Sequence, residues 1–273
     1  MSRQKGTEMV GAELLETGRL SEAIERVAGE VKAKPGDLAA RTFYFELLSL
    51  NGDLDRAAKQ ADVLASAAGE LGGGVNVYVG AIQAERERRA FFHGGPRPRL
   101  LSEPPYAGTC LEAVEHNAAG DPNTAMARLQ AAAEQECSLH GTLNGSEVHD
   151  LTDSHDLLGP FLELVVENHY AWAPWEAVES LSIPEPRYLR DTVWTPASLK
   201  LHSGDYGEVL LFSLYVDSHL QSDDVKLGRR TVWEQTSAGF TVAYGQKVIA
   251  VGDRDWPLLE IRKLEVEVCR LAA

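Results

Sequence analysis

Apolar residues recur three and four positions apart through the first half of the chain, whereas apolar and polar residues alternate through parts of the second half. The first pattern, in alanine-rich sequence such as residues 20–31, is typical of packed helices. The second is clearest where Leu264, Val266 and Val268 alternate with glutamates, as in a strand with one solvated face. The change falls near residue 140, so the sequence predicts helices first and a sheet second.

The fold class that follows is a two-domain protein. We predict an all-α, tetratricopeptide-like helical repeat domain over residues 1–145 and an α+β domain over residues 146–273, joined within a loop-like stretch at 141–154. Connections in the second part are too short for repeated βαβ crossovers, so its sheet is expected to be mainly antiparallel or barrel-like. Helices are expected at 157–168 and 175–181, strands at 208–216, 240–244, 247–251 and 258–268, and a hairpin turn at 244–247.

A repeated turn supports the helical prediction. Gly18 and Gly52 lie 34 residues apart, a leucine and an alanine follow each at the same offsets, and a third copy of the glycine and alanine begins at Gly120. Pro35 stands where a second helix should stop. A 34-residue period is the signature of tetratricopeptide-like hairpins, in which glycine ends one helix and a small alanine lets the next approach. The next expected glycine position is occupied by Arg86, so the repeat signature is absent there. We still expect a helix at 77–92 that continues the array. The alternative is an alanine-rich helical bundle in which the spacing of the glycines is a coincidence.

Composition and charge argue against several classes of protein. The 273 residues include 26 Lys and Arg against 41 Asp and Glu, a formal charge of −15, which argues against nucleic acid as a partner. Three widely spaced cysteines predict no disulfide framework. The first nine residues lack the apolar core of a signal peptide, and no stretch approaches the roughly 20 apolar residues of a membrane helix. We therefore expect a cytoplasmic protein without membrane insertion.

The best candidates for metal binding or acid/base catalysis lie at residues 149–156. Two histidines and three aspartates occur in these eight positions: His149, Asp150, Asp153, His155 and Asp156. Such side chains bind cations, and Cys137 and His140 are additional candidate ligands. The spacing nevertheless matches no zinc or EF-hand pattern, and Asp153 and Asp156 are suited to capping a helix that begins near residue 157. The chain contains no G-x-S-x-G nucleophile elbow and no phosphate-binding loop. The aromatic residues at 170–175 are expected to belong to the core of the sheet domain.

An ordered set of motifs in the second half is more distinctive. Its members are Asp153, Asp156, Gly159, Pro160, Leu162 and Glu163, then Tyr170, Trp172, Pro174, Trp175 and Glu176, then Arg190, Asp191, Trp194, Pro196 and Ala197, then Gly207, Glu208 and Val209, and finally Leu227, Gly228, Arg229, Arg230, Thr231 and Trp233. Together they resemble the ImpE family, also called TagJ or SciE, which comprises accessory proteins of bacterial type VI secretion systems. The helical half resembles the N-terminal repeat region of that family, so the resemblance covers essentially the whole chain.

The resemblance implies a non-enzymatic adaptor without cofactor, metal or catalytic residue. Its expected partner is the small subunit of the contractile sheath, bound through an N-terminal helix, and some members also contact the AAA+ ATPase that disassembles contracted sheaths. A helical-repeat groove and an acidic C-terminal domain suit capture of an amphipathic or basic helix. The signature positions, whose structural or binding roles the resemblance leaves unassigned, are Asp153, Asp156, Gly159, Pro160, Tyr170, Trp172, Pro174, Arg190, Asp191, Trp194, Gly228, Arg229, Thr231 and Trp233.

Two alternatives remain open from the residues. One is a metal-dependent or small-molecule-processing enzyme that uses the Asp/His cluster at 149–156 as ligands or acid/base groups. The other is a binding edge formed by Arg229, Arg230 and Trp233. For Arg229 we favour a structural role instead, an ion pair with Asp191 inside the domain.

Overall fold

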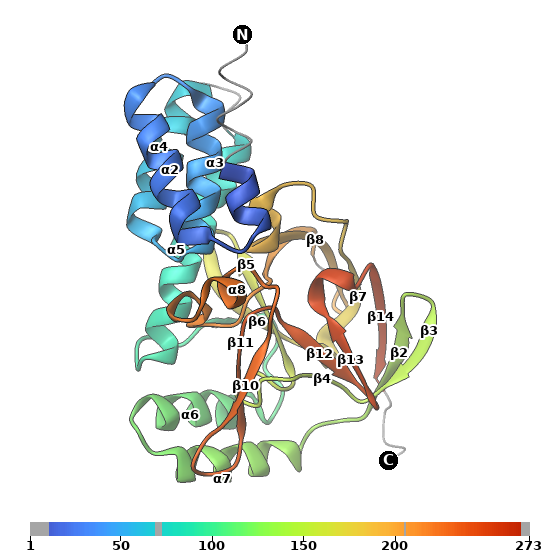
Figure 1. Ribbon diagram of the computed structural model, residues 1–273. Helices are drawn as coiled ribbons and strands as arrows, with labels where there is room; N and C mark the ends of the chain where they lie inside the picture. Colours follow the sequence, from blue (N-terminus) through green and yellow to red (C-terminus); the bar gives the residue numbers. More distant parts are fainter. Residues whose placement is uncertain (1–10, 69–72, 205, 269–273) are drawn as a thin grey trace.

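The N-terminal part of the protein is helical (Figure 1). The computed structural model describes residues 11–68, 73–204 and 206–268. Residues 11–16 are helical and precede a series of further helices: α2 (Leu20–Ala33), α3 (Leu38–Leu50), α4 (Leu54–Ala68), α5 (Gly73–Phe92), α6 (Ala107–Ala118) and α7 (Pro122–Ala133). Helix α2 ends before Pro35, as the sequence predicts, and none of the described helices is long and apolar enough to cross a membrane.

The three glycine turns have the predicted geometry. Gly18, Gly52 and Gly120 have φ values of +78°, +73° and +77°, the left-handed region in which a side chain is strained. In each turn the glycine N–H donates to the carbonyl three residues earlier, and the next N–H donates to the carbonyl five residues before it. These bonds satisfy carbonyls that the end of a helix leaves open. The alanines that follow the three turns are fully buried: Ala23, Ala57 and Ala125.

The C-terminal part is built on a nine-stranded sheet in the order β1-β6-β5-β9-β8-β7-β14-β2-β3. Neighbouring strands are antiparallel except for β1, which runs parallel to β6. A smaller sheet has the order β13-β12-β4, and β10 and β11 form a two-stranded ribbon. The strands are β1 (Arg99–Leu100), β2 (Leu139–Leu143), β3 (Ser146–His149), β4 (Leu151–Asp153), β5 (Phe161–Val166), β6 (His169–Pro174), β7 (Val178–Ser182), β8 (Trp194–Leu201), β9 (Glu208–Phe212), β10 (Val232–Gln235), β11 (Thr241–Tyr244), β12 (Val248–Val251), β13 (Arg254–Pro257) and β14 (Lys263–Val268).

The predicted fold class is therefore confirmed: a helical N-terminal region is followed by a mixed, mainly antiparallel sheet. Both faces of the central strands are covered. Along β6, Tyr170 and Trp172 belong to the apolar core shared with the helices, whereas Ala171 and Ala173 belong to a second core on the opposite face. The predicted core role of these aromatic residues is confirmed, because Trp172 and Trp175 are 0 % and 1 % exposed. The division of the chain at residue 145 stays a prediction.

Two predicted helices are wrong. Residues 157–168 contain a tight turn and then β5, and residues 175–181 contain a single 3-10 turn, η2 (Trp175–Ala177), followed by most of β7. The helix at 157–168 was predicted wrongly because all six residues of β5 are buried. Apolar and polar residues therefore do not alternate along Phe161–Val166. A short, continuous apolar run is equally compatible with a buried helix and a strand that is covered on both faces.

Two predicted connections are also wrong. The stretch at 141–154 is not a loop, because it contains most of β2 and all of β3 and β4. No hairpin joins 240–244 to 247–251, because β11 pairs with β10, while β12 pairs with β13 and β4. Gly245 lies between them at φ +99°, and a Cβ there would lie 2.1 Å from the carbonyl oxygen of Arg230. The chain therefore changes sheets at this glycine.

The helices form a layer against the C-terminal part, in which α5 contacts strands of the sheet and α3 contacts a turn beside it. Helix α5 contacts β5 and β6, and α3 contacts the 3-10 turn η3 (Leu189–Thr192) (Figure 1). The approach of α5 is close, because a Cβ at Gly80 would lie 1.9 Å from Oδ1 of Asn168. The C-terminal part thus covers the sides of α3 and α5 that an open repeat would leave available for a peptide.

Candidate functional site

Four charged side chains lie together between α5 and the two sheets, and we call them the buried charge cluster: Arg88, Asp153, Glu163 and Lys247. Nε of Arg88 donates to Oε1 of Glu163 at 2.9 Å, and Nζ of Lys247 lies 2.7 Å from Oε2 of the same carboxylate. Lys247 also donates to Oδ2 of Asp153 at 3.1 Å. All four residues are at most 3 % exposed. Buried charges are tolerated only when they are paired, and here two cations face two anions.

The pairing sets the protonation of the cluster. Burial by itself raises the pKa of Glu163, but the charges of Arg88 and Lys247 outweigh it and lower that pKa to about 2. Burial raises the pKa of Asp153, and Lys247 offsets this only in part. Glu163 is therefore the firmly ionised centre of the cluster.

An aromatic shell encloses these charges. Nε1 of Trp172 donates to the Tyr170 hydroxyl, which donates to Oε1 of Glu163. Nζ of Lys247 lies 4.7 Å from the ring centroid of Tyr215, whose hydroxyl donates to the carbonyl of Val248 at 3.0 Å. The shell keeps water from the cluster and strengthens its electrostatic interactions.

His155 belongs to the same shell. Its ring lies between Phe92 and Tyr215, with centroid distances of 6.1 and 5.6 Å, and the residue is 3 % exposed. Burial, together with the charge of Lys247, lowers the pKa of His155 to about 3. His155 is therefore a neutral side chain at physiological pH, packed as an aromatic ring.

Local sequence explains how these groups meet. Glu163 is the one charged residue in the apolar strand β5, and Arg88 lies in the charged run at 85–89 of α5. Asp153 ends β4, and its Oδ1 accepts the backbone N–H of His155 at 2.9 Å in the turn that follows. The sequence signal that could have revealed the cluster is the single carboxylate, Glu163, in an otherwise apolar strand. Nothing in the sequence pattern indicates that Arg88 and Lys247 are its partners.

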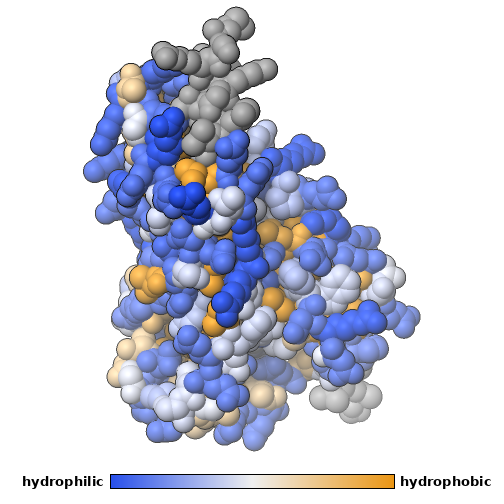
Figure 2. Space-filling model, in the orientation of Figure 1, coloured by the Kyte–Doolittle hydropathy of each residue, from blue (hydrophilic) through white to orange (hydrophobic). Residues whose placement is uncertain are grey.

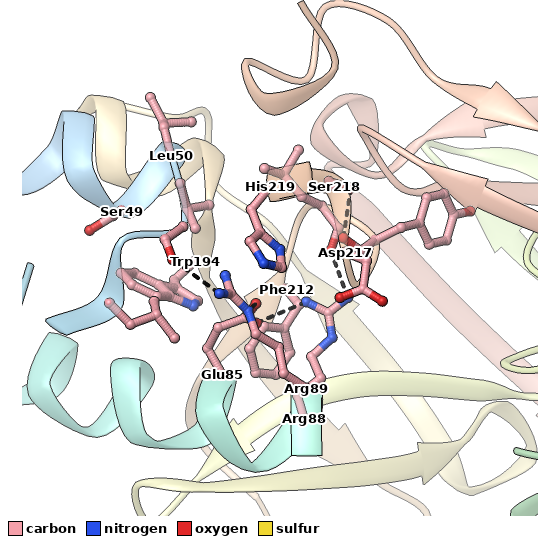
Figure 3. Close-up of a pocket in the computed structure, with 15 residues that line it drawn as sticks. Ser49, Leu50, Glu85, Arg88, Arg89, Trp194, Phe212, Asp217, Ser218 and His219 are labelled. Carbon is pink, nitrogen blue, oxygen red and sulfur yellow. Dashed lines mark hydrogen bonds and ion pairs between the residues drawn. The ribbon is translucent and has the colours of Figure 1, made fainter. Parts of the chain in front are cut away.

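A small cavity adjoins the cluster on the side of the helical layer (Figure 3). It is lined by Glu85, Arg88, Arg89 and Trp194 on one side and by His219 on the other. Its volume of about 20 Å³ accommodates about one water molecule. Substrate pockets are at least ten times larger, so this cavity is not a substrate site.

A second polar contact joins α3 and α5 to η3. Nη1 of Arg190 donates to Oε1 of Glu46 at 2.6 Å, and the guanidinium lies 5.1 and 4.0 Å from the rings of Tyr78 and Tyr188. Asp191 does not pair with Arg229, contrary to expectation. Its carboxylate instead accepts backbone N–H groups within its own turn, including that of Tyr188 at 3.0 Å.

A third contact joins the segment at 217–229 to the glycine turns of the helices. Arg229 donates to the carbonyls of Leu15 and Glu16, in the last turn of the first helix, at 2.7 and 2.9 Å. Oδ2 of Asp223 accepts the N–H of Ser21 at 3.1 Å and so caps the start of α2. These two side chains connect the C-terminal part to the helices. Arg229 makes these contacts instead of the predicted ion pair with Asp191.

The Asp/His set at 149–156 does not converge. Asp153 and His155 are buried, and Asp156 binds the N–H of Thr241 at 2.6 Å instead of capping a helix. His149 is exposed and contacts His140. Within residues 11–68, 73–204 and 206–268, no three His, Cys, Asp or Glu side chains are arranged to hold a metal ion. Neither Cys110 nor Cys137 forms a disulfide, and Cys269 lies outside the described residues.

The remaining signature positions shape turns and strands. Gly159 (φ +30°) and Gly228 (φ +65°) occupy turns, and Thr231 donates to the carbonyl of Gln246 at 2.8 Å. Pro160 accepts the N–H of Trp175 through its carbonyl, at 2.9 Å, and Pro174 ends β6 opposite Phe161. Trp194 starts β8 and is fully buried, whereas Trp233 on β10 is 48 % exposed.

Comparison with known proteins fits this architecture. A model of the family described as ImpE protein matches residues 145–265. The type VI secretion system accessory component TagJ of Pseudomonas aeruginosa is 33 % identical over 97 % of this chain and 94 % of its own length. The chain belongs to the ImpE family. A crystal structure of a protein from Vibrio parahaemolyticus superposes with a TM-score of 0.88 at 24 % identity, covering 96 % of this chain and 98 % of that one, and so has the same fold.

The buried charge cluster lies where α5 meets the sheet, and its members are paired with one another and shielded from solvent. Such an arrangement orients the helical layer on the sheet, and it offers no exposed group for binding a substrate.

Proposed function

We propose that this ImpE-family protein is a non-enzymatic adaptor of a bacterial type VI secretion system, acting in the cytoplasm. Its partner is the N-terminal helical segment of the small subunit of the contractile sheath. The observation that carries the proposal is the 33 % identity, over nearly the whole chain, to a protein named as an accessory component of such a system. Contact with the AAA+ ATPase that disassembles sheaths is a second, separable part of the proposal.

The physical properties of the chain support a helix-binding role. Stacked helices bind partner helices through apolar anchors, and a formal charge of −15 attracts a basic or amphipathic segment. Figure 2 shows one face of the molecule on which hydrophilic residues predominate and apolar areas are small and separate. Small apolar anchors with charge around them are typical of a reversible contact.

The partner helix binds, in this proposal, outside the surface where α3 and α5 contact the C-terminal part. Leu38, Val63 and Val77 are 44, 42 and 47 % exposed, and they lie on α3, α4 and α5. Nη1 of Arg41 donates to Oε1 of Gln60 at 2.6 Å, which brings the start of α3 beside the middle of α4. Leu38 and Val63 therefore lie toward the same end of the helical layer, and in this proposal they and Val77, near the start of α5, supply the apolar anchors.

Calorimetric titration with the N-terminal peptide of the small sheath subunit, from the same secretion gene cluster, tests the function. We expect saturable one-to-one binding at micromolar affinity that weakens at high salt. Absence of binding to both the peptide and the intact sheath heterodimer overturns the adaptor function.

Variants test the placement separately. Val63→Glu and Val77→Glu should each weaken binding about tenfold, whereas Trp233→Ala, which removes an exposed aromatic residue elsewhere, should leave it unchanged. Full binding by both glutamate variants overturns the placement and leaves the adaptor function standing.

A further inference from the structure

Two histidines face each other at the open edge of the nine-stranded sheet. His140 on β2 and His149 on β3 are direct cross-strand partners, and their Nδ1 atoms lie 2.7 Å apart. The ring centroids are 4.9 Å apart with an angle of 77° between the planes. Both residues are exposed, so the pair is open to solvent and to solutes.

A carboxylate extends this pair to the next strand. Glu267 on β14 is the direct partner of His140 on the side opposite His149. Because residues directly opposite each other in antiparallel strands point to the same face, the three side chains form one row across β3, β2 and β14. The surrounding groove is acidic, since it is also lined by Glu147, Glu179 and Glu265, with Lys200 as its single lysine.

The row has the chemistry of a transition-metal site. Imidazole nitrogens bind Zn²⁺, Ni²⁺ and Cu²⁺, and ions of this class also accept carboxylate oxygen. Two nitrogens at about 2.0–2.1 Å from one tetrahedral ion lie about 3.3 Å apart. The observed 2.7 Å between the Nδ1 atoms of His140 and His149 reaches that separation through a small rotation of either ring.

We propose that His140 and His149 chelate a divalent transition-metal ion, with Glu267 supplying a carboxylate oxygen from the neighbouring strand. The two imidazoles are already together, and a side-chain rotation of Glu267 completes the set when the ion binds. The ion cross-links β3, at the edge of the sheet, to β2 and β14. Its remaining coordination positions face the acidic groove and are filled by water or by an external ligand.

Titration of the untagged, metal-free protein with Zn²⁺ at neutral pH, in competition with a chromogenic chelator, tests the site. We expect one equivalent to bind, and His140→Gln and His149→Gln should each weaken that binding about tenfold or more. His202→Gln is the matched control, because this exposed histidine lines the same groove outside the pair, and it should leave the affinity unchanged. Glu267→Gln should weaken binding by a smaller factor.

Two further readouts separate this site from binding by thiols or by scattered histidines. Cu²⁺ bound to the wild type should show nitrogen coupling from two imidazoles in its electron paramagnetic resonance spectrum, and the coupling should fall to one nitrogen in either variant. Zn²⁺ should raise the Tm of the wild type and of His202→Gln but not that of the pair variants. Equal affinity in the wild type and the His140→Gln/His149→Gln double variant, with both folded by circular dichroism, overturns the proposal.

Discussion

Arg88 of α5 and Glu163 of β5 are 75 positions apart in the chain, and their side chains meet at 2.9 Å in the interior of the protein. The guanidinium also donates to the carbonyl of Leu214 at 2.8 Å and to Glu85 at 3.0 Å. One arginine thus links a helix of the N-terminal layer to two segments of the C-terminal part. The buried charge cluster therefore specifies how the helices lie on the sheet.

Glu163→Gln should destabilise the fold strongly. The substitution leaves Arg88 and Lys247 buried next to an uncharged amide, and breaking a buried ion pair in this way costs about 3–5 kcal/mol. Chemical denaturation measures the loss. The matched control is Glu167→Gln, because Glu167 is exposed and pairs with an exposed Arg99, so its loss should stay below about 1 kcal/mol. Equal losses in the two variants would refute the structural role of the cluster.

The protein should lose stability as the pH falls below neutrality, in part because of His155. The folded-state pKa of about 3 lies below the ordinary value of 6.5, so between these values the unfolded chain binds a proton that the native state excludes. Each pH unit in this window costs up to about 1.4 kcal/mol for one group. Glu163, with its pKa lowered to about 2, adds stability that is present above its unfolded pKa and is lost as the pH falls toward 2.

The comparison of variants isolates the histidine. Asp153, whose pKa is raised, contributes with the opposite sign, because its contribution is lost as the pH rises through its folded pKa. Both proteins keep Asp153, and only the wild type has the titrating His155. Denaturation at intervals from pH 7 to pH 4 should therefore show that the free energy of unfolding falls less steeply in His155→Gln than in the wild type. Parallel declines would contradict a neutral, buried His155.

Gly52→Ala should destabilise the protein more than Gly120→Ala. Both glycines have a φ near +75°, so both substitutions carry a similar backbone strain of about 1–2 kcal/mol. At Gly52 a Cβ would also lie 2.3 Å from Cβ of His219, whereas no atom lies within 4 Å of the corresponding position at Gly120. Thermal unfolding compares the two variants. A loss at Gly120 equal to that at Gly52 would argue against close packing of the 217–229 segment on that turn.

Asp223→Ala should cost about 0.5–2 kcal/mol, because it removes the acceptor of the Ser21 N–H at the start of α2. Asp223→Asn keeps an acceptor oxygen and should recover most of the loss. Denaturation of both variants measures this difference. An alanine variant as stable as the asparagine variant would show that α2 does not depend on this cap.

Local patterns were sufficient for the helical part. The 34-residue spacing of Gly18 and Gly52 predicted turns that have the expected left-handed backbone and hydrogen bonds, and Pro35 marked the end of α2. Local patterns failed in the sheet wherever burial on both faces removed the alternation of apolar and polar residues. The run that forms β5 therefore fits a helix as well as a strand. Strands β2 and β3 fail for a different reason, because most of their residues are exposed or half-buried and their polar sequence is typical of a loop.

The order of helices and sheet, the glycine turns, the acidic charge and the family motifs follow from the sequence alone, because each of these depends on residues close together in the chain or on composition. The partners of those motifs follow from the folded arrangement. It paired Arg88 with Glu163, Arg190 with Glu46 and Arg229 with the end of the first helix. It also separated His149 from Asp153 and placed it beside His140. The physical reason is that strand register and the packing of α5 against the sheet bring together residues that no local spacing relates.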